Sequence, residues 1–310
     1  MRTKRTAVIA AQEQAFLRSV LYAAVFDYPL TIDQLHEALI DMPATPDALA
    51  RWYRESDRLQ QLIEFRDGYF FPRGRPDLLD LRQRREVISR SLLEEMREPL
   101  ALVLHMPFVR MVALSGSLAH LNANGEADLD LFVITKANRV WSVTTTLLVL
   151  SRLMGGRRRL CLNYVISERH LGVEPQDLFS ANQIIHLRPL SGEDVYRRFV
   201  ESNAFVRERY PNFCPRRVAP SRTPARRVFE RALDWTLAPL YERLCRVAYA
   251  WHLRRRSSSW QSRDQVRLEP ECLKLHTSSH RQSVMERFEI AVAEAERVTR
   301  AATRHAQGVG

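Results

Sequence analysis

The chain is poor in cysteine and lysine and has no long uninterrupted apolar run. None of its four cysteines belongs to a Cys-x-x-Cys pair, which argues against a zinc cluster and a disulfide framework and favours a reduced, cytoplasmic compartment. The apolar run before Gln12 is too short for a signal-peptide core. The most apolar later stretch, residues 228–253, is broken by charged side chains, so we expect no membrane-spanning helix and no membrane partner.

Positive charge dominates the sequence, and nearly all of it is arginine. The formal net charge is +11, although only Lys4, Lys136 and Lys274 are lysines. A strongly basic protein attracts polyanions, so nucleotides, nucleic acids and acidic proteins are all candidate partners. The length of 310 residues suits two or three domains, and an apolar content of 45% is sufficient to bury a core.

The first predicted domain spans residues 1–76. Helical spacing of apolar residues and two threonine caps predict three helices, the last running from Thr45 to about Leu62. Two short apolar stretches around Arg66-Asp67-Gly68 predict a hairpin. Three helices followed by a hairpin resemble a winged helix-turn-helix domain.

Three arginines of the third predicted helix are candidate nucleic-acid contacts. Arg51, Arg54 and Arg58 fall on one helix face, which suits phosphate contacts in a DNA groove. Glu55 and Asp57 lie close by, so an ordinary solvated helix face fits the same pattern. Both interpretations stay open at this point.

The second predicted domain spans residues 77–190, and a third region spans residues 191–310. A charged helix over 77–106 is expected to bridge two domains, after which strands alternate with a helix, which is typical of an α/β sheet. The arginine-rich third region is predicted to be helical. The expected fold class is therefore α+β or α/β, with a winged helix, a central mixed sheet with helices and a C-terminal helical region.

A turn that suits phosphate follows the first strand of the second domain. The strand ends in Ser115-Gly116-Ser117, where a helix is predicted to begin. Glycine lets a ligand approach the backbone closely, and the free N–H groups of a helix N-terminus bind anions. The Ser117 hydroxyl supplies another donor.

A pair of carboxylates follows this turn in the next strand. Asp128 and Asp130 are two residues apart, so in a strand they point to the same face. Two neighbouring carboxylates repel each other unless a cation lies between them. Mg²⁺ with triphosphate oxygens is the expected partner.

The combination of these two motifs resembles the polymerase-β-like nucleotidyltransferase superfamily. Gly116 and Ser117 are followed by a ten-residue spacer and then by Asp-x-Asp between apolar residues. The resemblance implies that the turn, with Ser115, holds the phosphates of an NTP. It also implies that Asp128 and Asp130 bind two Mg²⁺ or Mn²⁺ ions for two-metal catalysis.

One position departs from that family, which usually supplies a third carboxylate from a later strand. The matching strand, residues 159–167, has Asn163 as its central polar residue, and asparagine cannot act as a base. Glu168, at the end of that strand, is a candidate substitute. Lys136 and Arg139 follow the Asp-x-Asp strand and could reach a phosphate or a base, although both also suit a solvated helix start.

Three functional hypotheses follow from these motifs. The first is a Mg²⁺-dependent nucleotidyltransferase that moves NMP from an NTP to a hydroxyl on a protein, an RNA end or a small molecule. The alternative is a catalytically impaired nucleotide-binding regulator that binds DNA through the winged helix. In the third, the chain modifies or sequesters a protein as one partner of a toxin–antitoxin pair.

Overall fold

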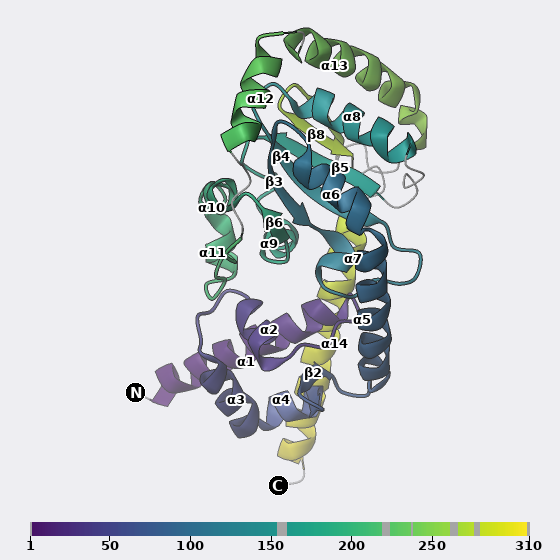
Figure 1. Ribbon diagram of the computed structural model, residues 1–310. Helices are drawn as coiled ribbons and strands as arrows, with labels where there is room; N and C mark the ends of the chain where they lie inside the picture. The colour runs from purple at the N-terminus through teal and green to yellow at the C-terminus, as the bar shows by residue number, and fades with distance from the viewer. Residues whose placement is uncertain are drawn as a thin grey trace.

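A mixed sheet with helices on both faces forms the centre of the molecule, and a helical unit with a small hairpin lies at one end (Figure 1). The mixed α and β class expected from the sequence is therefore confirmed. The computed structural model describes residues 2–153, 160–218, 224–236, 238–260, 266–275 and 280–308.

The end unit contains helices and a two-stranded hairpin. Their bounds are α1 Arg2–Ala24, α2 Ile32–Glu37, α3 Pro46–Glu55, α4 Asp57–Leu62, β1 Ile63–Arg66 and β2 Tyr69–Pro72. The expected hairpin forms, because β1 and β2 pair antiparallel around a turn in which Gly68 has a φ of +84°. Leu30 adds a single antiparallel bridge to Phe70 of β2.

The third predicted helix is divided into α3 and α4, which corrects the expectation of one continuous helix. Ser56 between them has extended backbone angles, and its hydroxyl accepts a hydrogen bond from the Leu59 backbone at 3.1 Å. The same hydroxyl donates to the Glu13 carboxylate of α1 at 2.5 Å. Serine side chains compete with helical backbone bonds in this way, so Ser56 starts a new helix rather than continuing the old one.

The predicted bridging helix, residues 77–106, is also divided. It consists of α5 (Asp77–Glu95) and α6 (Arg97–His105), which are separated at Met96. Pro99 has no N–H to donate to the Glu95 carbonyl, so an unbroken helix would lose a hydrogen bond and clash there. α5 runs from the end unit to the sheet (Figure 1).

The central sheet has six described strands in the order β6-β3-β4-β5-β8-β7. Their bounds are β3 Val109–Leu114, β4 Leu129–Thr135, β5 Leu160–Ser167, β6 Arg188–Ser191, β7 Val266–Glu269 and β8 Cys272–Leu275. β4 and β5 are parallel, and the other neighbouring pairs are antiparallel. The sequence predicts that residues 191–310 are helical, but β7 and β8 lie in this range. The prediction misses them because strands of four residues are too short to give a periodic signal.

Helices cover both faces of this sheet (Figure 1). The remaining described helices are α7 Gly116–Ala119, α8 Val140–Leu153, α9 Leu178–Ile185, α10 Glu193–Glu201, α11 Phe205–Arg209, α12 Pro224–Asp234, α13 Ala238–Arg255 and α14 Arg281–Gly308, with a short 3₁₀ turn at Ser257–Ser259. α8 and α13 pack together on one face. None of the described helices is both long and apolar enough to cross a membrane.

The sheet separates two apolar cores. Phe132 and Ile134 of β4 face the core that includes α9 and the end unit. Leu131 and Val133 face the core beneath α6, α8 and α13. This alternation follows from the two-residue repeat of a strand, and it turns Asp130 toward the same side as Phe132.

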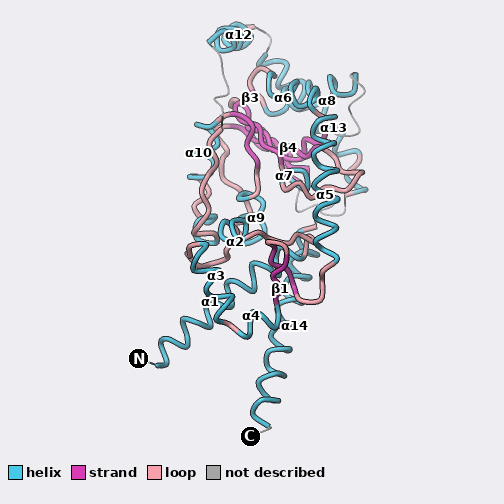
Figure 2. Tube along the Cα trace, turned by 60° about the horizontal axis from the view of Figure 1, so that its bottom comes forward, coloured by secondary structure: helices cyan, strands magenta, loops and turns pink. Residues whose placement is uncertain are grey.

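The last helix ties the end unit to the rest of the chain. α14 packs against α1, where the Phe288 and Tyr22 rings meet edge to face at 5.0 Å. Both ends of the chain lie beside this unit in Figures 1 and 2. α5 and α14 therefore form two separate connections between the end unit and the sheet.

Candidate metal and nucleotide site

The Ser115-Gly116 turn lies directly against the start of β4. The Ser115 backbone N–H donates to the Asp130 carbonyl at 2.9 Å. Gly116 has a φ of +63°, and a Cβ atom placed on it would lie 2.5 Å from Oδ2 of Asp130. Glycine is therefore required by both the backbone conformation and the closeness of the carboxylate. The predicted phosphate turn and one predicted metal ligand thus meet in space.

The two aspartates of the Asp-x-Asp motif differ in their surroundings. Asp128 is exposed and precedes β4, whereas Asp130 is half-buried as the second residue of the strand. The Asp130 backbone N–H donates to the Asp128 carbonyl at 3.1 Å, which makes a tight turn through Leu129. The two-residue spacing alone predicts that the motif lies in one straight strand. The turn shows that it does not.

The surroundings of Asp130 disfavour its negative charge. Burial raises the pKa of this carboxyl to about 6, and the nearby charge of Asp128 adds to the effect, while a hydrogen bond from the Cys161 thiol opposes it. A cation between the two carboxylates would relieve both costs. The arrangement thus suits a divalent ion that prefers oxygen ligands.

Cys161 is a neighbour of the site that sequence reasoning missed. β5 runs parallel to β4 with Cys161 opposite Asp130 and Tyr164 opposite Phe132, so β5 carries one extra residue between these two pairs. Asn163 belongs to β5, but its side chain lies outside the described residues. The alternation of strand residues would allow Cys161 as well as Asn163 to face Asp130, and only the register decides which one does.

Glu168 lies at the other end of the sheet from Asp130. Its backbone N–H donates to the carbonyl of Thr135, the last residue of β4. Its carboxylate forms long ion pairs with Arg110 at 3.9 Å and with Arg198 at 3.7 Å. Because about five residues of strand separate it from Asp130, roughly 16 Å, the structure does not bring Glu168 to the site.

Lys136 and Arg139 lie at the same distant end of β4. Both side chains form ion pairs with Asp234 of α12, in which Nη2 of Arg139 is 2.7 Å from the carboxylate. The Arg139 side chain is almost fully buried. These two cations therefore hold α12 against the sheet, and the structure does not gather them with Gly116 and Asp130.

The candidate nucleic-acid contacts are separated by the break at Ser56. Arg51 and Arg54 are exposed on α3. Arg58 lies on α4, where its guanidinium donates to Gln14 at 3.3 Å and to Thr299 of α14 at 3.4 Å. Arg58 therefore joins α4 to α1 and α14, and of these three arginines only Arg51 and Arg54 remain on an open helix face.

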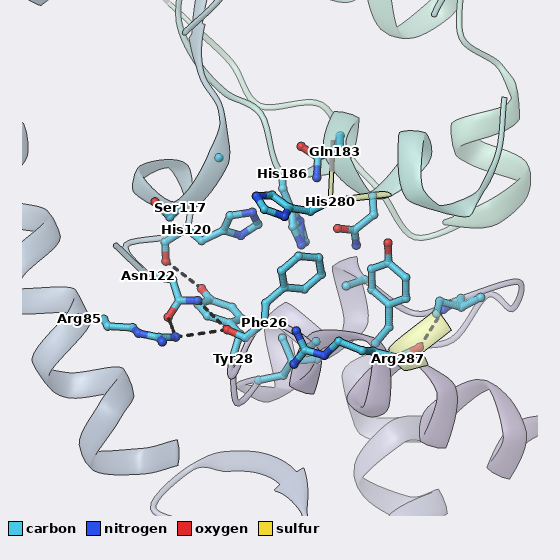
Figure 3. A pocket seen from close by; sticks show the side chains of 18 of the residues that line it. Phe26, Tyr28, Arg85, Ser117, His120, Asn122, Gln183, His186, His280 and Arg287 are labelled. Atoms are coloured by element: carbon cyan, nitrogen blue, oxygen red, sulfur yellow. Dashed lines mark hydrogen bonds between the residues drawn. The ribbon is translucent and has the colours of Figure 1, made fainter. Parts of the chain in front are cut away.

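Two neighbouring cavities adjoin at Gly116, which lines both. The first, of about 660 Å³, lies between the end unit and α9, and we call it the histidine cavity because His120, His186 and His280 line it (Figure 3). The second, of about 530 Å³, lies on the Asp130 side, and we call it the aromatic cavity after Phe132, Tyr164, Phe179 and Phe199. Ser117 opens on the first cavity, and Asp130 on the second.

Two histidines form a neutral pair beside the turn. The rings of His120 and His186 meet edge to face at 4.2 Å (Figure 3). Burial lowers the pKa of His120 to about 4 and holds the pKa of His186 well below its ordinary value, and nearby arginines add to both shifts. The Tyr28 hydroxyl of the end unit donates to the His120 carbonyl at 3.1 Å, so the pair lies at the junction of the two parts of the molecule.

Within the described ranges, no three histidine, cysteine or acidic side chains are grouped closely enough to hold a metal ion by themselves. Ligands from a bound triphosphate would therefore have to complete any metal site at Asp128 and Asp130. No protein-family model, curated protein or solved structure matches this chain.

Proposed function

We propose that this protein is a Mg²⁺-dependent nucleotidyltransferase that moves NMP from an NTP to a hydroxyl. The observation that carries the proposal is the contact between Gly116 and Asp130, where a Cβ atom would lie 2.5 Å from the carboxylate. It brings a turn suited to phosphate against a carboxylate suited to a metal ion. In this proposal α1–α4 with the hairpin are a winged helix, and the central sheet is the nucleotidyltransferase domain.

The residues present fit a divalent ion of the magnesium type. Asp128 and Asp130 offer hard oxygen ligands, and burial together with the charge of Asp128 raises the pKa of Asp130, a cost that a bound cation would relieve. Bound Mg²⁺ would withdraw charge from the triphosphate and favour pyrophosphate as the leaving group. Two ions are expected from the family resemblance, with triphosphate oxygens as further ligands.

The chain itself would position the reacting groups. The backbone N–H groups at Gly116 and Ser117 and the Ser117 hydroxyl would hold the outer phosphates. The acceptor oxygen would then attack the α-phosphorus, the bond from that phosphorus to its bridging oxygen would break, and pyrophosphate would leave. The hydroxyl proton would pass to water.

The test of this function is transfer from α-³²P-labelled NTPs in the presence of Mg²⁺, with a cell extract as the source of acceptors. We expect label on an acceptor with the wild-type chain and at least a hundredfold less with Asp130→Asn. Asp194→Asn, which removes an exposed carboxylate of α10, is the matched control. Equal labelling by wild type and Asp130→Asn would exclude this site as the catalytic one.

A second candidate function is the nucleotide-binding regulator without transfer. Its support is that Asp130 is the only acidic side chain among the described residues that line either cavity, and that Glu168 lies far away. This version predicts Mg²⁺·NTP binding without turnover and salt-sensitive binding of duplex DNA. DNA affinity that is unchanged in Arg51→Ala/Arg54→Ala would count against it.

A further inference from the structure

The aromatic cavity occupies the face of β4, β5 and β8 that lies beneath α9 and α10. Phe132 and Tyr164 form its floor, with ring centres 5.1 Å apart, and Phe199 of α10 lies 4.9 Å from Phe132. Phe26 of the end unit and Val284 of α14 also line it. The middle of the cavity is therefore apolar and largely aromatic, and several separate elements build it.

The two ends of this cavity carry opposite charges. Asp130 lies at one end, where it is the only acidic side chain among the described lining residues. Lys274 of β8 lies at the other end, opposite Tyr164 in the sheet. Arg281 of α14, which is ion-paired with Asp177, also lines the cavity. Because Lys274 lies two strands across and about two residues along from Asp130, their Cα atoms are roughly 12 Å apart.

The Lys274 ammonium belongs to the cavity wall and does not extend away from it. Its Nζ atom lies 5.3 Å from the centre of the Tyr164 ring and donates to the Glu174 carbonyl at 3.3 Å. Burial lowers the pKa of this amine, which marks a cation that is poorly solvated. An anionic group near Lys274 would offset part of this desolvation cost, in addition to the interactions that the amine already makes.

We propose that the aromatic cavity binds an amphiphilic anion with an aromatic or alkyl body about as long as the gap between Asp130 and Lys274. Its carboxylate, phosphate or sulfonate meets Lys274, its body lies on Phe132 and Tyr164, and its other end reaches Asp130. That this ligand is the acceptor, with a hydroxyl at the Asp130 end, rests on the proposed function. A small acceptor then follows, because a folded protein or a duplex does not fit into a cavity of about 530 Å³.

The direct test is a fluorescence titration of the full chain with 8-anilinonaphthalene-1-sulfonate, an aromatic anion that becomes bright in apolar surroundings. We expect one saturable site, at least tenfold weaker in Lys274→Met and restored in Lys274→Arg. Arg287→Met is the matched control, because it also removes one positive charge from a cavity wall, but from the histidine cavity. Thermal unfolding of each variant shows whether it is folded.

Two results would overturn the proposal. One is affinity that is unchanged in a folded Lys274→Met variant, and the other is an equal loss in Lys274→Met and Arg287→Met. Dye adsorbed on exposed apolar side chains such as Leu244 and Val247 of α13 would remain in every variant and can be subtracted.

A parallel titration with Mg²⁺ and a non-hydrolysable NTP separates this inference from the proposed function. If dye binding depends on Lys274 and no NTP binds, the cavity site is supported and the transferase function is excluded. If NTP binding depends on Asp130 and dye binding does not depend on Lys274, the nucleotide site is supported and the cavity site is overturned.

Discussion

Asp130 makes the folded protein less stable than a neutral side chain would at the same position. Its pKa is raised from 3.8 to about 6, so the folded state holds this proton more tightly than the unfolded chain does. The free energy of unfolding therefore falls as the pH rises from about 4 to about 6. Above that range it stays below its value at pH 4 by an amount on the order of 2 kcal/mol. Charge retained at such a cost is typical of a functional position.

Asp130→Asn should therefore raise the midpoint of thermal unfolding at pH 8 and change it little at pH 4. Scanning calorimetry at the two pH values, without divalent ions, measures the difference. Asp194→Asn, at an exposed position, should show no such dependence on pH. An equal effect of Asp130→Asn at both values would mean that the carboxylate is not destabilised by its surroundings.

Gly116 should tolerate no side chain. In Gly116→Ala the methyl group would meet the Asp130 carboxylate, and the φ of +63° would add backbone strain, so we expect a loss of about 2–4 kcal/mol. Gly68→Ala is the matched control, since Gly68 also has a positive φ but has no atom within 4 Å of the added methyl. It should lose only about 1 kcal/mol. Urea unfolding of both variants isolates the contribution of the contact.

At the scale of elements, the sequence is most informative where a local signal is strong. The hairpin around Gly68, the first of the two predicted threonine caps, Thr31 before α2, and the strand before Ser115 all form near the predicted residues. The breaks at Ser56 and Met96 are missed because helical periodicity continues across them. Ser56 and Pro99 nevertheless give the chemical reason for each break.

The site is predicted less completely than the fold. The Gly-Ser turn and Asp130 are close in sequence, and the antiparallel pairing of β3 with β4 brings them together. Cys161 and Lys274 depend on strand register and on a strand from the C-terminal region, and no local pattern contains that information. Glu168 follows β5, which runs parallel to β4. It therefore lies at the end of the sheet opposite to Asp130.

The packing of α13 depends on a buried carboxylate that caps another helix. The Glu242 carboxylate accepts hydrogen bonds from the Trp141 and Ser142 backbone N–H groups, at 3.0 and 2.7 Å, at the start of α8. A negative charge at a helix N-terminus is stabilising, and more so when it is buried and hydrogen-bonded.

Glu242→Ala should lower the free energy of unfolding by about 2–4 kcal/mol, because two buried N–H groups would lose their acceptor. Glu296→Ala, which removes a partly exposed carboxylate of α14, should cost less than about 1 kcal/mol. Chemical denaturation followed by circular dichroism compares the two. A small effect of Glu242→Ala would show that this cap contributes little to the packing of α8 and α13.

At the scale of the whole molecule, the two parts meet around a neutral histidine pair. His120 and His186 are uncharged in the folded state, whereas the unfolded chain binds protons below about pH 6.5. Since the folded pKa of His120 is about 4, stability should be lost as the pH falls from 6.5 toward 4.

His120→Gln should weaken this acid sensitivity by an amount on the order of 2 kcal/mol between pH 7 and pH 4.5. His105→Gln, at an exposed position near the end of α6, should leave it unchanged. Thermal unfolding across this pH range measures both. An acid sensitivity that is the same in His120→Gln as in the wild type would show that other groups cause it.

The proposed function depends on one site at which the Gly116 turn and Asp130 hold a nucleotide through a metal ion. Calorimetric titration with a non-hydrolysable NTP, with and without Mg²⁺, tests this directly. We predict binding at one site that requires Mg²⁺, falls at least tenfold in Asp130→Asn and is unchanged in Asp194→Asn. Binding that needs no metal, or that is equally strong in Asp130→Asn, would contradict the account.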